Sequence, residues 1–241
     1  RRVENILQAR DEAQIHSLPS APKEIEKIYR ILGFNSEYEF TSKLDSHRKI
    51  VHRFFSSLFE MDYEFEELRC AIQSNIESCA SEEELADSFA WFKNQEYRRI
   101  LALEESGKIS LIESQRRLSL VARVVVSAAL SEAQNSLRKR FGRPILESGE
   151  EAHFAIIGLG RLGSEEMDYG SDLDLIFVYS GNGSTNGSKK ISNAEFFTRV
   201  AQRLISRLSL HSRYGRAYQV DSELRPSGNA GALVTTLESF N

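Results

Sequence analysis

The 241-residue sequence has only two cysteines, no apolar run long enough to span a membrane and no excess of basic residues. Cys70 and Cys79 lie in a stretch of helical pattern without a secretion signal, so we expect reduced thiols rather than a disulfide. The longest apolar run, residues 118–130, is interrupted by Arg123, which excludes a transmembrane helix. These absences together predict a cytoplasmic protein without a membrane partner.

The charges are nearly balanced, since 31 lysines and arginines against 35 aspartates and glutamates give a net charge of −4. A nucleic-acid partner usually requires a basic surface, so this balance argues against one. With 41% apolar and 27% charged residues, the chain has the composition of a globular protein with one large or two small domains. It begins without methionine and stops at Asn241, and we therefore expect a piece of a longer protein.

Serine followed three residues later by glutamate, the pattern of a helix-capping box, recurs along the chain. The pairs are Ser36 with Glu39, Ser81 with Glu84, Ser110 with Glu113, and Ser192 with Glu195. They predict helices over residues 36–59, 81–103, 110–140 and 192–211. A shorter helix is expected over 23–32, the end of a preceding helix over 1–16, and helix or loop over 61–80. The first 142 residues are thus expected to be almost entirely helical.

At Ala152 the apolar pattern changes from helical spacing to short runs typical of strands. Strands are expected over residues 154–157, 173–179, 216–224 and 231–236, and residues 180–190 are expected to form a flexible loop because they are rich in glycine, serine and asparagine. The predicted fold class is α+β, with a long helical N-terminal region followed by a mixed sheet with flanking helices. The predicted domains are 1–60, the end of a preceding helical unit with a linker; 61–145, a helical region; and 146–241, a core that carries the chemistry.

The polar residues of that core cluster between its first two strands. Asp172 and Asp174 begin the second strand and project to the same side, where two like charges repel unless a cation lies between them. Hard carboxylate oxygens suit Mg²⁺. Gly163-Ser164 can bring backbone N–H groups close to a phosphate, because glycine has no side chain in the way. The alternative for this pair of aspartates is a solvated strand end or a turn.

This stretch resembles the nucleotidyltransferase superfamily that includes DNA polymerase β, which carries a Gly-Ser pair, a short spacer and then Asp-x-Asp on a strand. Residues 158–177 read Gly-Leu-Gly-Arg-Leu-Gly-Ser-Glu-Glu-Met-x-x-x-Ser-Asp-Leu-Asp-Leu-Ile-Phe, which is similar to the glutamine synthetase adenylyltransferases within that superfamily. The resemblance implies a polymerase β-like nucleotidyltransferase core, ATP as substrate, and Mg²⁺ held by Asp172 and Asp174.

A second block, Val220-Asp-Ser-Glu-Leu-Arg-Pro-Ser-Gly228, resembles the family's Val-Asp-x-x-Leu-Arg-Pro-x-Gly. The resemblance implies that Asp221 is the third catalytic, metal-binding carboxylate, and that Gly163, Ser164 and Arg225 bind the nucleotide. Many family members have a basic residue at the position of Glu223, so the local charge departs from the family pattern there.

Residues 2–19, with Arg-Val-Glu-x-x-Leu-Gln and later Gln-x-His-x-Leu-Pro, resemble the segment that closes the first of the family's two transferase units. The resemblance implies that the unit after residue 150 is the second one, that it attaches AMP to a tyrosine of glutamine synthetase, and that a PII-type nitrogen signalling protein controls it. Two alternatives stay open: phosphorolytic removal of AMP by the same three aspartates, and a non-catalytic segment that binds a regulatory partner.

Overall fold

The computed structural model describes residues 22–222 and 231–240, with the side chains of residues 48–63 outside the description. The chain divides into two units, Arg1–Tyr63 and Glu64–Asn241. The helices are α2 (Pro22–Ile31), α3 (Glu37–Ile76), α4 (Glu82–Glu105), α5 (Leu111–Phe141), α6 (Gly160–Gly163), α7 (Asn193–Ser209) and α8 (Leu237–Phe240). The strands are β1 (Pro144–Leu146), β2 (Phe154–Gly158), β3 (Leu173–Tyr179), β4 (Gly183–Thr185), β5 (Val220–Asp221) and β6 (Val234–Thr236). The α+β fold class is confirmed.

All four serine–glutamate pairs cap helices as the sequence predicts. The hydroxyl of Ser81 accepts a hydrogen bond of 3.1 Å from the backbone N–H of Glu84, and Ser110, Ser192 and Ser36 act in the same way at their helices. These bonds satisfy backbone donors that the first helical turn would otherwise leave unpaired. The predicted starts of α3, α4, α5 and α7 are therefore confirmed to within one residue.

In the first unit, α2 and the start of α3 share a small core. Ile28 and Phe40 are its buried residues, and Phe34 packs edge-on against Phe40 with the ring centres 5.6 Å apart. Residues 1–16, for which we expected a helix, lie outside the described residues.

The predicted end of α3 near Phe59 is wrong, because the helix continues to Ile76. Phe65, Leu68, Ile72 and Ile76 recur every three or four residues and place one apolar stripe against the core of the second unit. Burial of this stripe stabilises the helix beyond residue 60, where the sequence alone did not distinguish helix from loop.

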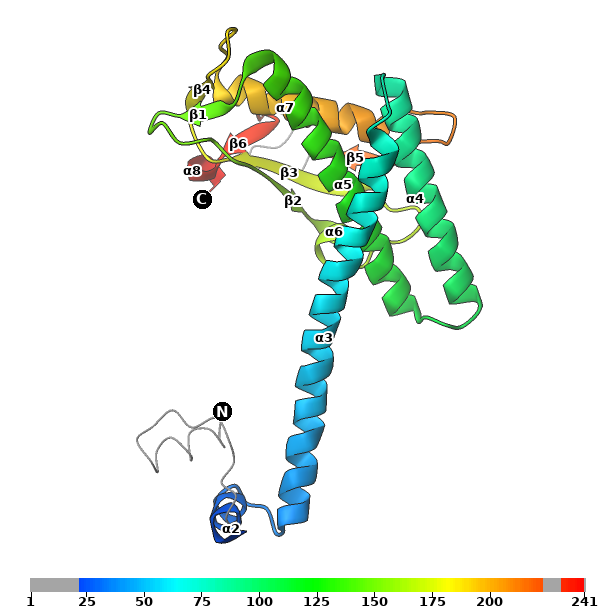
Figure 1. Ribbon diagram of the computed structural model, residues 1–241, viewed down its shortest axis with the longest axis vertical. Coiled ribbons are helices and arrows are strands. Elements are labelled where there is room, and N and C mark those ends of the chain that lie inside the picture. Colours follow the sequence, from blue (N-terminus) through cyan, green and yellow to red (C-terminus); the bar gives the residue numbers. More distant parts are fainter. Residues whose placement is uncertain (1–21, 223–230, 241) are drawn as a thin grey trace. The chain divides into compact units, whose positions relative to one another are not determined.

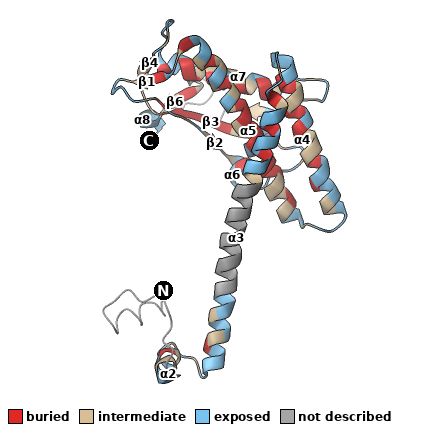
Figure 2. Ribbon diagram, viewed as in Figure 1, coloured by how far each residue is buried: buried red, intermediate tan, exposed pale blue. Residues whose placement is uncertain are grey.

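The second unit packs its long helices and its sheet around one core, which runs from Leu68 to Val234. In Figure 1, α5 and α7 cover one face of the sheet, and Figure 2 shows buried residues concentrated in α5, α7 and β3. Phe197 of α7 stacks on Phe154 of β2 at 5.1 Å and lies 5.4 Å from Tyr179 of β3. The helices and the sheet thus share a core across the predicted boundary near residue 145, and that division into domains stays a prediction.

The main sheet is mixed, with the order β2-β3-β5, and β6 also pairs with β3. Strands β2 and β3 are antiparallel, with Phe154 opposite Tyr179, whereas β5 and β6 run parallel to β3. Strand β5 pairs with the beginning of β3, at Leu173 and Asp174, and β6 pairs with its end, at residues 177–179. The first residues of β3 therefore lie beside the chain segment that contains Asp221.

Residues 180–190, for which we expected a flexible loop, contain strand β4, which pairs with β1. Asn186 accepts a hydrogen bond of 2.8 Å from the backbone N–H of Arg143, and the amide of Asn193 donates to the carbonyl of Ile145 at 3.0 Å. Composition did not reveal this strand, because its partners lie some 40 residues earlier in the chain. Strand β5 is also shorter than the predicted 216–224, although residues 223–230 lie outside the described residues.

No helix in the described part of the chain is both long enough and apolar enough to cross a membrane.

Arg207 of α7 is almost fully buried, with 2% of its side chain exposed, and it binds Glu82 at the start of α4 through two hydrogen bonds of 2.6 and 2.9 Å. Replacing Glu82 by glutamine removes the counter-charge of a buried guanidinium, with Glu132 remaining 3.7 Å away. We expect Glu82→Gln to lower the free energy of unfolding at pH 7 by about 1–3 kcal/mol, discounted for the exposure of Glu82. Chemical denaturation of the wild-type protein and of Glu82→Gln measures this difference in the free energy of unfolding.

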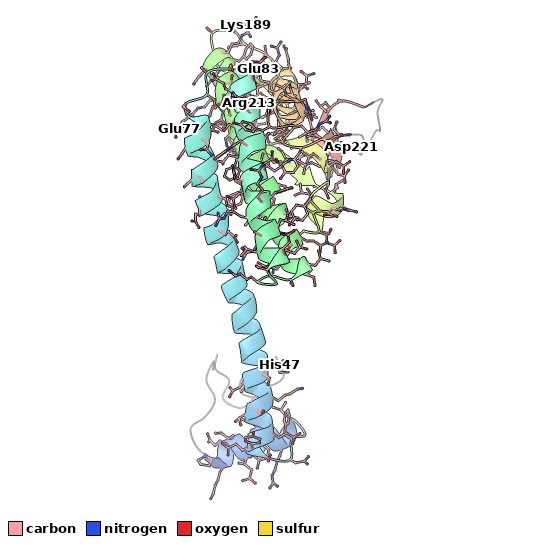
Figure 3. All side chains as sticks on the ribbon, turned by 90° about the vertical axis from the view of Figure 1, so that its right-hand side faces the viewer. His47, Glu77, Glu83, Lys189, Arg213 and Asp221 are labelled. Atoms are coloured by element: carbon pink, nitrogen blue, oxygen red, sulfur yellow. The ribbon has the colours of Figure 1, made fainter. Side chains whose placement is uncertain are left out.

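Glu83→Gln is the matched control. Glu83 is exposed in the same first turn of α4 (Figure 3), so its substitution removes the same charge near the start of the helix. The hydrogen bond from Arg207 lowers the pKa of Glu82 below its ordinary value of 4.5, so its contribution is complete above that pH and is lost as the pH falls through the lowered pKa. Equal losses in the two variants at pH 7 would show that the contact between Arg207 and Glu82 adds nothing to stability.

Candidate active site

At the start of strand β3, the partly exposed Asp174 lies between two buried leucines. Leu173, Leu175 and Phe177 are buried in the core beneath the helices, so Asp174, between them, projects from the opposite face. Asp172 precedes the strand and is exposed. The anchoring of β3 in the core therefore presents Asp174 on the face away from α5 and α7.

Asp221 of β5 is the register partner of Asp174 in the parallel pair. Partner residues on neighbouring strands project from the same face, and the strands lie about 4.8 Å apart. Figure 3 shows Asp221 on the side of the sheet opposite α4. Burial, followed by the negative charges of Asp172 and Asp221, raises the pKa of Asp174 above its usual value. The structure therefore brings the three predicted aspartates into electrostatic contact.

This donor set can be compared with what Mg²⁺ requires. Among the described residues, no group of three or more histidine, cysteine, aspartate or glutamate side chains is arranged to hold a metal ion as the side chains lie. Proteins commonly bind Mg²⁺ through one or two carboxylates while substrate phosphates and water complete the shell. Asp174 and its strand partner Asp221 offer hard oxygen donors and share a charge repulsion that a cation relieves, so the residues fit an ion that is bound together with a nucleotide.

The Gly-Ser pair ends the short helix α6, directly after β2. The N–H groups of Gly163 and Ser164 donate to the carbonyls of Leu159 and Gly160 at 3.0 and 3.1 Å, so both are used inside the turn. The hydroxyl of Ser164 lies 3.2 Å from the Gly160 carbonyl and 3.1 Å from Oε2 of Glu166. Phosphate binding at Gly163 and Ser164 stays a prediction, and it would replace hydrogen bonds within this turn.

Two residues at this turn were not predicted from the sequence. Gly160 has a φ of +51°, a backbone conformation that favours glycine, and a Cβ atom there would meet Oδ2 of Asp174, so the turn lies directly against this carboxylate. Glu165 has a φ of +60°, which is rare for a residue with a side chain, and its carboxylate pairs with Arg116 at 3.8 Å and Arg123 at 3.4 Å, both on α5. No spacing or residue type in the sequence marks Glu165.

Arg161 contacts the loop before β3, with Nη1 lying 3.3 Å from the hydroxyl of Ser171 and 3.8 Å from the carboxylate of Asp168. Arg225, the remaining predicted nucleotide ligand, and Glu223 lie outside the described residues.

The antiparallel strands β2 and β3 are joined through a Gly-Ser turn, and three aspartates lie on β3, directly before it and on its parallel neighbour β5. This arrangement is typical of a nucleotidyltransferase-like α+β fold. Comparison with known proteins gives the family. Residues 25–241 match the family model described as glutamate-ammonia ligase adenylyltransferase, and the chain belongs to that family.

The relatives include proteins named bifunctional glutamine synthetase adenylyltransferase/adenylyl-removing enzyme. The one from Pseudomonas aeruginosa is 31% identical over 96% of this chain and 24% of its own length. Those from Hahella chejuensis and Acinetobacter baylyi are 37% and 39% identical over 66% and 62% of this chain, and 17% of their own lengths. The chain thus spans about a quarter or less of the relatives it matches.

Gly163 also has a packing role that can be tested apart from any ligand. A Cβ atom on Gly163 would lie 2.7 Å from the carbonyl oxygen of Gly158 in β2, a main-chain atom that cannot turn away. We expect Gly163→Ala to cost about 1–3 kcal/mol of stability, as overpacking against fixed atoms does. Thermal denaturation of the chain without nucleotide measures it. Gly170→Ala is the control, because a Cβ atom there meets nothing within 4 Å; equal melting temperatures for the two variants would contradict the contact.

Proposed function

We propose that this chain carries the unit that transfers AMP from ATP to a tyrosine hydroxyl of glutamine synthetase, and so controls nitrogen assimilation. The observation that carries the proposal is the register of Asp174 with Asp221, with Asp172 close enough to act on the same carboxylate. Membership of the glutamate-ammonia ligase adenylyltransferase family supports the substrate class. A PII-type signalling protein as regulatory partner rests on the family resemblance alone.

In this proposal Asp172, Asp174 and Asp221 would hold Mg²⁺, which when bound would lower the pKa of the attacking tyrosine hydroxyl and neutralise charge on the departing pyrophosphate. The chain's own contribution is placement: β3 and β5 present Asp174 and Asp221 on one face of the sheet, and Gly163 and Ser164 at the α6 turn would contact the nucleotide's β- and γ-phosphates, together with Arg225. Such a reaction depends mainly on positioning and electrostatics, because phosphoryl-type transfer needs little covalent help.

We expect Asp174→Asn and Asp221→Asn each to reduce AMP transfer at saturating Mg²⁺ by about 100-fold or more, since a catalytic ion supplies several kcal/mol of transition-state stabilisation. The melting temperature should stay level or rise slightly, because each change relieves repulsion between neighbouring carboxylates. The measurement is transfer of radiolabel from ATP to purified glutamine synthetase by the parent protein, with a thermal melt of each variant.

Glu150→Gln is the control, because it removes one negative charge from an exposed loop of the same unit. Full AMP-transfer activity in Asp174→Asn would exclude the three aspartates as the catalytic site. It would favour the alternative that this chain is a non-catalytic segment that binds a regulatory partner. The direction of the reaction is read from the same parent protein: loss of AMP removal with retained attachment would assign this unit to the reverse reaction.

A further inference from the structure

Helix α4 carries a polar and aromatic stripe that the site as described does not use. Lys93, Tyr97 and Glu104 follow one another at intervals of four and seven residues, which places them on one face of the helix. Each of them contacts a segment that leads directly into a carboxylate of the site. Figure 1 shows α4 beside the segment that follows α7, and the amide of Asn94 donates to the carbonyl of Tyr214 there at 2.9 Å.

The first of these segments is the loop before Asp172. The ring of Tyr97 meets the ring of Tyr169 edge-on, with the centres 5.6 Å apart and the planes at 88°. The hydroxyl of Tyr169 donates to Oε2 of Glu104 at 3.1 Å. Since Tyr169 stands only three residues before Asp172, these two contacts tie the approach to Asp172 to α4.

The second segment leads into Asp221. The hydroxyls of Tyr97 and Tyr218 form a buried hydrogen bond of 3.1 Å, and their ring centres are 6.4 Å apart. Lys93 donates to the carbonyl of Arg216 at 3.1 Å, and its ammonium group lies 5.4 Å from the centres of both rings. Tyr218 in turn stands three residues before Asp221. Tyr97 therefore contacts both approaches to the site at once.

Burial raises the pKa of Tyr97 to about 12 and the pKa of Tyr218 well above its ordinary value of 10. Burial, together with the hydrogen bond to Glu104, also raises the pKa of Tyr169 to about 12. All three phenols thus remain neutral near pH 7, where they form hydrogen bonds as intact hydroxyl groups rather than as phenolates.

The sheet itself fixes Asp221 only weakly. Among the described residues, which stop at Ser222 on this side, β5 consists of two residues and pairs with β3 through Leu173 with Val220 and Asp174 with Asp221. A hydrogen bond of 2.9 Å from the backbone N–H of Leu173 to the carbonyl of Gln219 extends this pairing. A pairing this short leaves the relative position of the two strands dependent on what holds their flanking segments. Tyr97 holds both of them.

We propose that Tyr97 is a positioning residue for the aspartate site, which sets the spacing between Asp172 and Asp221 through its contacts with Tyr169 and Tyr218. The expected loss of AMP transfer rests on the proposed function, whereas the expected loosening of the two segments does not. Tyr97→Leu removes both ring contacts and the hydroxyl, whereas Tyr97→Phe keeps the ring contacts and removes only the hydrogen bond to Tyr218. Phe89→Leu is the matched control, because Phe89 is a fully buried ring on α4, about two turns earlier.

The experiment measures hydrogen exchange of backbone amides in the parent protein, followed by AMP transfer over a range of ATP concentrations at saturating Mg²⁺. For Tyr97→Leu we expect faster exchange in both residues 169–174 and 217–222, while residues 154–158 of β2 exchange as in the wild type. We expect kcat to fall about 10-fold or more, as small displacements of catalytic groups do, with the KM for ATP changed much less. Tyr97→Phe should restore most of kcat and should loosen only residues 217–222.

The same exchange pattern in Phe89→Leu at an equal loss of melting temperature would overturn the proposal, since it would show a general effect of an emptied core. Unchanged exchange in Tyr97→Leu would overturn it as well. If Tyr97→Leu does not fold, Tyr97→Phe and Tyr218→Phe serve as the test, because both keep the aromatic rings. Faster hydrogen exchange of residues 217–222 in both variants supports the proposal, and exchange as in the wild type refutes it. A wild-type protein without AMP transfer would contradict the proposed function, and the exchange result would still decide the role of Tyr97.

Discussion

The structure depends on the alternation of buried and partly exposed residues at the start of strand β3. Leu173, Leu175 and Phe177 fill the core beneath the helices, so Asp174 has to face the other side of the sheet, where its partner in β5 is Asp221. A shift of one residue in the pairing of β3 would turn Asp174 toward the core and move Leu173 out of it, which disfavours other registers at the start of the strand. The concentration of negative charge at the start of β3 is thus a direct consequence of how that strand is anchored in the core.

The helices contribute more than a cover for the sheet. The hydroxyl of Ser119 on α5 accepts a hydrogen bond of 3.2 Å from the backbone N–H of Met167, which is fully buried, and two arginines of α5 form ion pairs with the carboxylate of Glu165. The loop that joins the Gly-Ser turn to Asp172 is therefore fastened to α5, while α4 contacts the approach to Asp221 through Tyr218. The helical region and the sheet form one structural unit around the aspartates, although they differ completely in sequence pattern.

Local signals in the sequence were sufficient where the determining interaction is itself local. The capping serines marked the helix starts because the hydrogen bond they form spans three residues, and β3 was predicted to the residue because it is apolar between a polar turn and a glycine-rich segment. Strand β4, the second half of α3, and the contact of Gly160 with Asp174 were not predicted, since each depends on a partner distant in the sequence. The fold class followed from pattern, whereas grouping the aspartates required the family resemblance, because nothing in the spacing of residues 174 and 221 shows that β5 pairs with β3.

The central claim is that Asp172, Asp174 and Asp221 form one electrostatically coupled group that a cation can stabilise. A carboxyl-carbon NMR titration of Asp174, assigned by comparison with Asp174→Asn, tests it most directly. The account predicts a midpoint above the ordinary value of 3.8, which falls when Asp221 is replaced by asparagine and falls again when Mg²⁺ and ATP are added to the wild-type protein. An Asp174 that titrates at its ordinary value, and responds neither to Asp221→Asn nor to Mg²⁺ with ATP, would contradict the account.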